Sequence, residues 1–181
     1  MRRQWGGRWH RGAQRSVLAG AIVLLGACTG LRTLRLEADA SMLPVGVGNT
    51  GVHGIVTLVE RADGVQVTYD LQGLPPNSTH ALAIHEQGNC DALDASSAGP
   101  VFSPNATRLR RGARPDGALG TVRADLTGVA TGFLVERNLT LDGVNSVVGR
   151  AVIVHRDDDL DNAAADLGAG PALACGVLRT P

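Results

Sequence analysis

The fold of this chain is decided by the stretch VHGIVTLVERADGVQVTYD, residues 52–70. Its two halves, 52–60 and 65–70, are rich in β-branched residues, which favour extended strands. Between them lies RADG, residues 61–64, in which Asp-Gly is a strong signal for a tight turn. We therefore expect a β-hairpin of two antiparallel strands.

Similar short apolar runs continue toward the C-terminus, and no window has the period of an amphipathic helix. They predict five further strands, at 80–86, 120–125, 129–135, 150–155 and 174–178. Two long irregular segments, about 87–118 and 156–173, separate some of these strands. Loops of this length in a compact domain are usually functional. The pattern predicts an all-β fold, a Greek-key β-barrel or sandwich with two long loops.

Composition excludes several classes of protein. The 181 residues suffice for one domain, and with only 3% aromatic residues its core must consist of Val, Leu, Ile and Ala. The 17 basic residues, all arginine, are balanced by 17 acidic ones, which argues against a nucleic-acid partner. The mean hydropathy of +0.04, with one apolar run of about ten residues, excludes a polytopic membrane protein.

The N-terminus is typical of an exported lipoprotein. Residues 1–16 carry five arginines and no acidic residue, and an apolar stretch of eleven residues follows. This stretch ends in LGAC, residues 25–28, which resembles the bacterial lipobox whose Cys is lipidated. The alternative is an ordinary signal peptide with a chance cysteine.

These features predict three segments: a lipoprotein signal peptide at 1–27, a lipidated tether at 28–49 beginning with Cys28, and a domain at 50–181. Residue 29 is Thr rather than Asp, which in a bacterium with two membranes resembles a protein passed to the outer membrane. We therefore expect a cell-envelope protein that is anchored in a membrane by lipid and faces the periplasm.

Removal of residues 1–27 changes the charge and the cysteine count. Twelve arginines then face 17 acidic residues, a formal charge of −5. With Cys28 attached to lipid, Cys90 and Cys175 are the two candidates for a disulfide, which an oxidising compartment favours. The alternative is a pair of reduced, buried thiols.

Four blocks of sequence surround these cysteines. They are LPP at 74–76 with HALAIHE at 80–86 and Cys90, AGPVFSP at 98–104, GRAVIVH at 149–155, and LACGV at 173–177. In order and spacing the blocks resemble the copper/zinc superoxide dismutase family, over about residues 50–181. The resemblance implies a flattened Greek-key β-barrel whose two long loops wall a metal site. It also implies a disulfide between Cys90 and Cys175, and it leaves a homodimer among the assemblies to consider.

The resemblance implies four histidine ligands for copper, but this chain keeps two of them. The first and third ligand positions fall at Ala83 and Val101, whereas the second and fourth are His85 and His155. Cu(II) prefers four tetragonal ligands. We therefore expect at most a partial, weak copper site at His85 and His155.

Other positions of the family's site are altered as well. Residues 102–119 contain no histidine, and Ala118 stands where the family's zinc-binding Asp would be, so zinc binding is not expected even with Asp116 nearby. The arginine that guides superoxide falls at Ala172. His80 matches a family histidine that bonds backbone and binds no metal.

Three functions remain open at this stage. The first is a lipid-anchored binding or structural protein of unknown partner that has lost most of its metal chemistry. The second is a copper-dependent superoxide dismutase, which converts superoxide to oxygen and hydrogen peroxide. The third is a weak copper carrier. The substitutions at Ala83, Val101 and Ala172 favour the first.

Overall fold

The computed structural model describes residues 36–46, 51–104, 114–158 and 170–181, all within one compact unit, Leu34–Pro181. The predicted signal peptide, the lipidation site Cys28 and the first part of the tether lie outside the described residues. Across the described ranges, no helix is long and apolar enough to cross a membrane.

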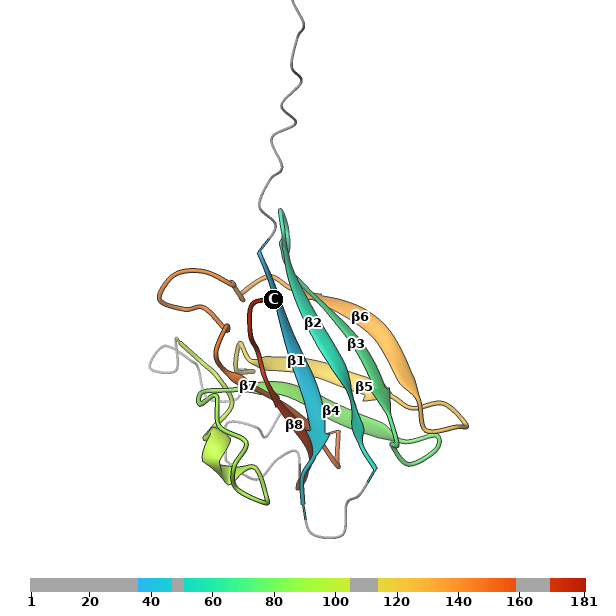
Figure 1. Ribbon diagram of the computed structural model, residues 1–181. Helices are drawn as coiled ribbons and strands as arrows, with labels where there is room; N and C mark the ends of the chain where they lie inside the picture. Colours follow the sequence, from blue (N-terminus) through green and yellow to red (C-terminus); the bar gives the residue numbers. More distant parts are fainter. Residues whose placement is uncertain (1–35, 47–50, 105–113, 159–169) are drawn as a thin grey trace, which may run out of the picture. The chain divides into compact units, whose positions relative to one another are not determined.

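The described part of the chain is built from eight antiparallel strands and one short 3-10 helix (Figure 1). They are β1 (Glu37–Pro44), β2 (His53–Arg61), β3 (Gly64–Gln72), β4 (Thr79–His85), η1 (Ser96–Ala98), β5 (Ala118–Arg123), β6 (Ala130–Glu136), β7 (Ala151–His155) and β8 (Ala172–Val177). The strands form a single sheet in the order β5-β4-β7-β8-β1-β2-β3-β6. The predicted all-β fold is confirmed.

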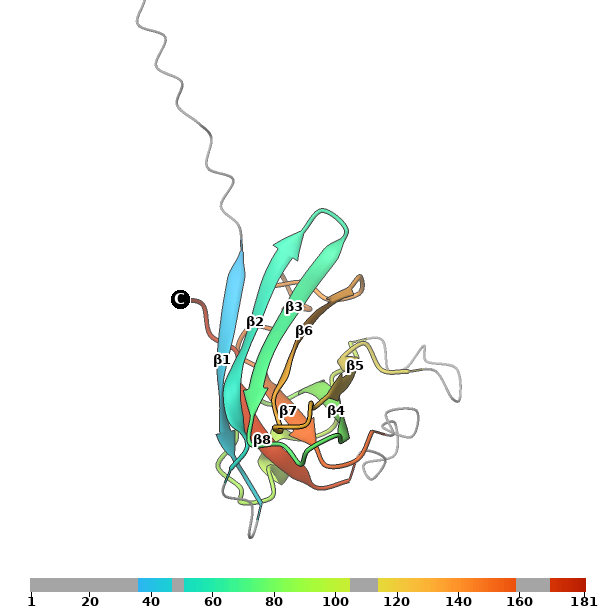
Figure 2. The ribbon, with the colours of Figure 1, turned by 90° about the vertical axis from the view of Figure 1, so that its right-hand side faces the viewer.

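The sheet bends so that its two halves face each other. β1, β2, β3 and β6 form one layer, and β4, β5, β7 and β8 cross behind it (Figures 1 and 2). The two edge strands, β5 and β6, approach each other without pairing. The result is a nearly closed barrel.

The hairpin predicted from residues 52–70 is formed by β2 and β3. Its register runs from the pair His53 and Gln72 to the pair Arg61 and Gly64, so two residues make the turn. Gly64 has a φ of +139°, and a Cβ there would lie 2.5 Å from the carbonyl oxygen of Glu136. The position therefore requires glycine.

One boundary predicted from the sequence is wrong. Residues 28–49 were expected to be a tether, but Glu37–Pro44 form β1, which pairs with both β2 and β8. The strand buries Ala38, Ala40 and Met42 in the core. The folded domain therefore begins before residue 50.

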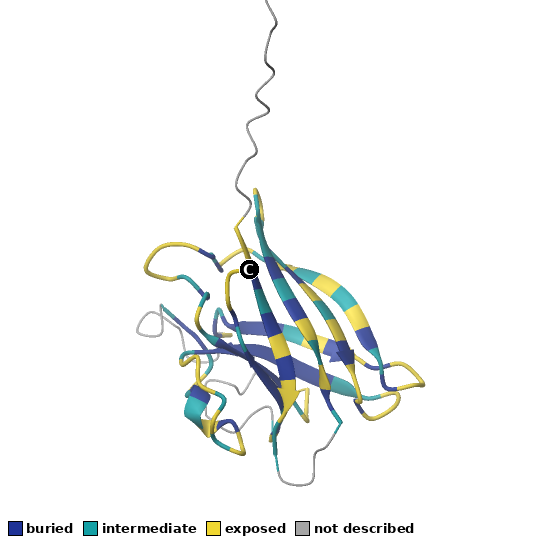
Figure 3. Cartoon of the chain, viewed as in Figure 1, coloured by how far each residue is buried: buried dark blue, intermediate teal, exposed yellow. Residues whose placement is uncertain are grey.

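The core lies between the two layers and consists mainly of Val, Leu and Ala, as composition predicted. Buried and exposed residues alternate along β1 and β3, whereas β4 and β7 are buried almost throughout (Figure 3). Strands buried on both faces are covered on the side away from the core. This covered outer face of β4 and β7 carries the histidines at the two strand ends.

Candidate metal site

The structure brings the two predicted copper-site histidines together. His85 ends β4 and His155 ends β7, and these neighbouring strands pair in antiparallel register. Nε2 of His85 lies 3.1 Å from Nε2 of His155, and the ring centroids are 5.2 Å apart. His85 is buried and His155 is partly buried.

A backbone carbonyl fixes the orientation of each ring. Nδ1 of His85 donates to the Gly99 oxygen at 2.7 Å, and Nδ1 of His155 donates to the Gly170 oxygen at 3.1 Å. Because a carbonyl can only accept, each ring hydrogen lies on Nδ1. The two Nε2 lone pairs therefore face each other, which is the arrangement of two ligands that share a cation.

Both supporting carbonyls belong to glycines whose φ is +69°, a backbone conformation that favours glycine. Sequence reasoning missed Gly99 and Gly170. The one available signal was that each lies in the motif AGP, at residues 98–100 and 169–171.

Burial strongly affects the protonation of His155. Loss of solvent lowers its pKa from 6.5 to about 4; the Gly170 carbonyl opposes this shift, whereas the nearby His85 ring adds to it. At neutral pH, His155 is therefore uncharged, and Nε2 carries a lone pair.

His80 supports this end of β7. It is buried, and its Nδ1 lies 3.0 Å from the oxygen of His155 and 2.9 Å from the oxygen of Arg156. Its other nitrogen, Nε2, contacts the Ser78 hydroxyl. With both nitrogens engaged in this way, His80 positions the backbone of His155, as the resemblance implied.

Apolar side chains occupy three of the positions that the resemblance assigns to metal ligands, 83, 101 and 118. Ala83 and Ala118 form a buried cluster with Ala81, and Val101 packs against it. Val101 also forms an isolated backbone bridge with His85, so it lies next to the histidine pair. We call these four residues the apolar cluster. It contributes no side-chain nitrogen, oxygen or sulfur.

The structure also places two further residues considered for the site, Ala172 and Asp116. Ala172, where the family's arginine would lie, is packed in a second buried group with Ala151 and Ile153. Asp116 lies near Glu136, and its negative charge helps to raise the pKa of Glu136. Burial is the larger cause of this upward shift, and the positive charge of Arg114 opposes it. Among the described residues, no group of three or more His, Cys, Asp or Glu side chains could hold a metal ion.

The described residues at this site do not fit a copper–zinc pair. Two imidazole nitrogens are fewer than the four tetragonal ligands that Cu(II) prefers, and fewer than the four tetrahedral ligands typical of zinc. No catalytic step through such a centre is derived for this chain.

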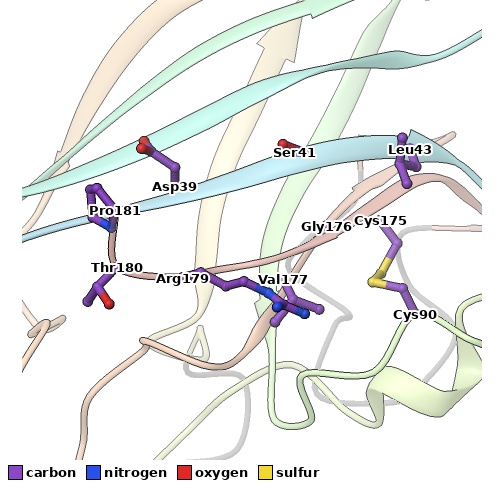
Figure 4. A pocket seen from close by; sticks show the side chains of 10 residues that line it. All are labelled: Asp39, Ser41, Leu43, Cys90, Cys175, Gly176, Val177, Arg179, Thr180 and Pro181. Carbon is purple, nitrogen blue, oxygen red and sulfur yellow. A yellow bond between two sulfur atoms is a disulfide. The ribbon is translucent and has the colours of Figure 1, made fainter.

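The disulfide implied by the resemblance is present between Cys90 and Cys175, with a Cα–Cα distance of 5.8 Å. It ties the segment after β4, which includes Gly99, to β8. The bond also lines a pocket of about 440 Å³ on the outer face of β1 and β8, together with Leu43, Val177 and Arg179 (Figure 4). Neither His85 nor His155 lines this pocket.

The fold and the site together define a Greek-key β-barrel with a covered histidine pair. Residues 52–178 match the family model for copper/zinc superoxide dismutase. The chain is 39% identical to a Cu–Zn superoxide dismutase of Yarrowia lipolytica over 142 residues, and 38% identical to one of Candida glabrata over 144. Each match covers 72% of this chain and 92% of the relative. The chain belongs to the copper/zinc superoxide dismutase family.

Proposed function

We propose that this chain is a lipid-anchored cell-envelope member of the family whose metal centre is reduced to His85 and His155. Such a site binds copper weakly, takes no zinc, and converts superoxide to oxygen and hydrogen peroxide slowly or not at all. The observation that carries this proposal is the apolar cluster, in which Ala83, Val101 and Ala118 occupy ligand positions.

The loss of ligands affects the oxidised metal most. A dismutase cycle needs a copper site that accommodates both oxidation states, and the Cu(II) state depends on four ligands. Ala172 also removes the positive charge that would attract an anionic substrate. Both changes lower turnover, the first through metal affinity and the second through substrate encounter.

The location is proposed from the N-terminal sequence. The arginine-rich start, the apolar stretch and Cys28 favour export and lipidation, and Thr29 favours the outer membrane. Lipidation of Cys28 with more than one acyl chain would give stable membrane residence, whereas a single acyl chain gives only marginal binding.

A second candidate function is that of an active copper-dependent dismutase. The convergence of the two Nε2 atoms at 3.1 Å favours it, since a working half of a copper site is kept. The names of the similar fungal proteins favour it as well.

One experiment separates the two candidates. Full-length protein purified in detergent is loaded with copper, and its metal content and its superoxide turnover are measured on the same sample. We expect less than one Cu(II) per chain after dialysis, and a rate of superoxide loss close to that in buffer without protein. Stoichiometric copper with fast turnover would favour the active enzyme and overturn the proposal.

A further inference from the structure

We infer that the His85–His155 pair is a two-coordinate site for a monovalent d10 cation, Cu(I) or its redox-inert analogue Ag(I), and that it selects this cation over Cu(II) and Zn(II). The inference rests on the proposed function, because it names the metal ion that the reduced site takes.

The first argument is the direction of the donors. Both Nδ1 atoms donate to glycine carbonyls, so the two Nε2 lone pairs point at one place from neighbouring strand ends. Two nitrogen donors that face each other give a linear arrangement. A closed-shell monovalent copper or silver ion accepts two ligands in a line, whereas Cu(II) and Zn(II) prefer four.

The second argument is the chemistry beside the pair. In the family, further ligands would extend from positions 83, 101 and 118, but here those positions hold the apolar cluster. Ala83 is fully buried and Ala118 nearly so. A divalent ion, which is strongly hydrated, would lose its water beside apolar carbon without gaining ligands. A soft monovalent ion is penalised less.

The third argument is the separation of the rings. Two metal–nitrogen bonds of about 2 Å each place the ligand atoms about 4 Å apart when they lie in a line. The Nε2 atoms lie 3.1 Å apart, so binding requires them to separate by about 1 Å. His155 ends its strand and is the more exposed of the two rings, so we expect the movement on its side, with a longer contact between its Nδ1 and the Gly170 oxygen.

The test uses the full-length protein in detergent under anaerobic conditions. Cu(I) binding is measured by competition with a chromogenic Cu(I) chelator, Ag(I) by displacement of Cu(I), and Cu(II) and Zn(II) by dialysis. The variants His85→Gln and His155→Gln remove one donor each. His53→Gln is the matched control, because His53 is an exposed histidine whose Nδ1 contacts the Gly51 carbonyl instead.

We expect one Cu(I) per chain, displaced by Ag(I), with affinity at least tenfold lower in both site variants and unchanged in His53→Gln. The X-ray absorption spectrum of the wild-type Cu(I) form should show two nitrogen ligands, a result that does not depend on the folding of any variant. Cu(II) and Zn(II) should bind at least tenfold more weakly than Cu(I).

Three or more ligands in that spectrum, or Cu(II) or Zn(II) binding as tight as Cu(I), would overturn the inference. Cu(I) affinity that is unchanged in both site variants would overturn it as well. Superoxide turnover measured on the same samples keeps the two proposals apart. Fast turnover contradicts the proposed function, whereas absent selectivity without turnover contradicts only the inference made here.

Discussion

Nε2 of His85 faces Nε2 of His155 at 3.1 Å, although the two residues are 70 positions apart in sequence. Two of the four positions that the resemblance assigns to copper ligands thus hold histidine rings that face each other. The other two, Ala83 and Val101, hold packed carbon. The histidine pair and the apolar cluster lie side by side, because Val101 both bridges to His85 and packs against the alanines of the cluster.

The burial of His155 predicts a pH-dependent stability. Because the pKa of His155 falls from 6.5 to about 4 in the folded protein, the unfolded chain binds the extra proton between these values. The free energy of unfolding therefore decreases as the pH falls from about 6.5 to about 4, by up to about 3 kcal/mol. Urea unfolding at several pH values measures this slope.

In His155→Gln the slope over this interval should be much smaller, while His53→Gln should keep it. Asp125 also has a shifted pKa, but it does not contribute to the slope between pH 6.5 and 4. The Thr127 side chain lowers its pKa below the usual 3.8, so its contribution is lost only at still lower pH. Equal slopes in the wild type and His155→Gln would show that His155 is not buried in its neutral form.

The glycine that holds His155 predicts a local effect of substitution. In Gly170→Ala, the residue must keep a φ of +69°, which L side chains rarely adopt, and its Cβ displaces the Asp157 carboxylate, so we expect the Gly170 carbonyl beside His155 to shift. Gly143→Ala is the matched control, with a φ of +76° and open space around it. In both variants, backbone strain should lower the free energy of unfolding by about 1 kcal/mol. Only Gly170→Ala should shift the imidazole NMR signals of His155, and equal signals in both variants would refute this role.

The disulfide predicts a large stability difference. Cys90 and Cys175 are 85 residues apart. Closing a loop of this length reduces the conformational entropy of the unfolded chain, which raises its free energy by about 4 kcal/mol. Cys90→Ser should therefore lower the free energy of unfolding by a few kcal/mol, with Cys28→Ser as the control that leaves the bond intact. Denaturation without reductant should reveal no thiol from this pair. Equal unfolding midpoints for Cys90→Ser and the control would contradict the prediction.

The proposed anchor predicts a change of location. Cys28→Ser should incorporate no labelled fatty acid and should leave the membrane fraction, because the acyl chains supply the binding free energy. Thr33→Ser, which preserves the cysteine, should remain in the membrane fraction. Lipid on the Cys28→Ser protein would show that the lipobox interpretation is wrong.

Most of the fold could be predicted because its strands carry local signals. The hairpin of β2 and β3 has β-branched runs and an Asp-Gly turn. β1 was missed because its sequence, EADASMLP, is poor in residues that favour strands. Its buried residues do alternate, but two of them are alanines, and the strand is held by pairing with β2 and β8. Such pairing between distant segments leaves little local signal.

The candidate site could be predicted only in part. The resemblance identified His85, His155 and the altered positions, since these are questions of residue type. The supporting carbonyls of Gly99 and Gly170 could not be predicted. Every residue has a carbonyl, and only the folded backbone determines which of them points at a histidine ring. That Ala81 joins Ala83 and Ala118 in one cluster likewise depends on strand pairing between β4 and β5.

The central claim is that missing ligands, rather than a changed frame, weaken the copper site. The most direct test is the Cu(II) dissociation constant of the full-length protein before and after Ala83→His with Val101→His. The matched control is Ala81→His with Val101→His, which places the second imidazole in the same cluster but further along β4 from His85. We predict that the restoring pair binds Cu(II) at least tenfold more tightly than the wild type, about 1.4 kcal/mol, and more tightly than the control. Equal Cu(II) affinity in the wild type and the restored variant would contradict the account, because the wild type would then already hold ligands beyond the histidine pair.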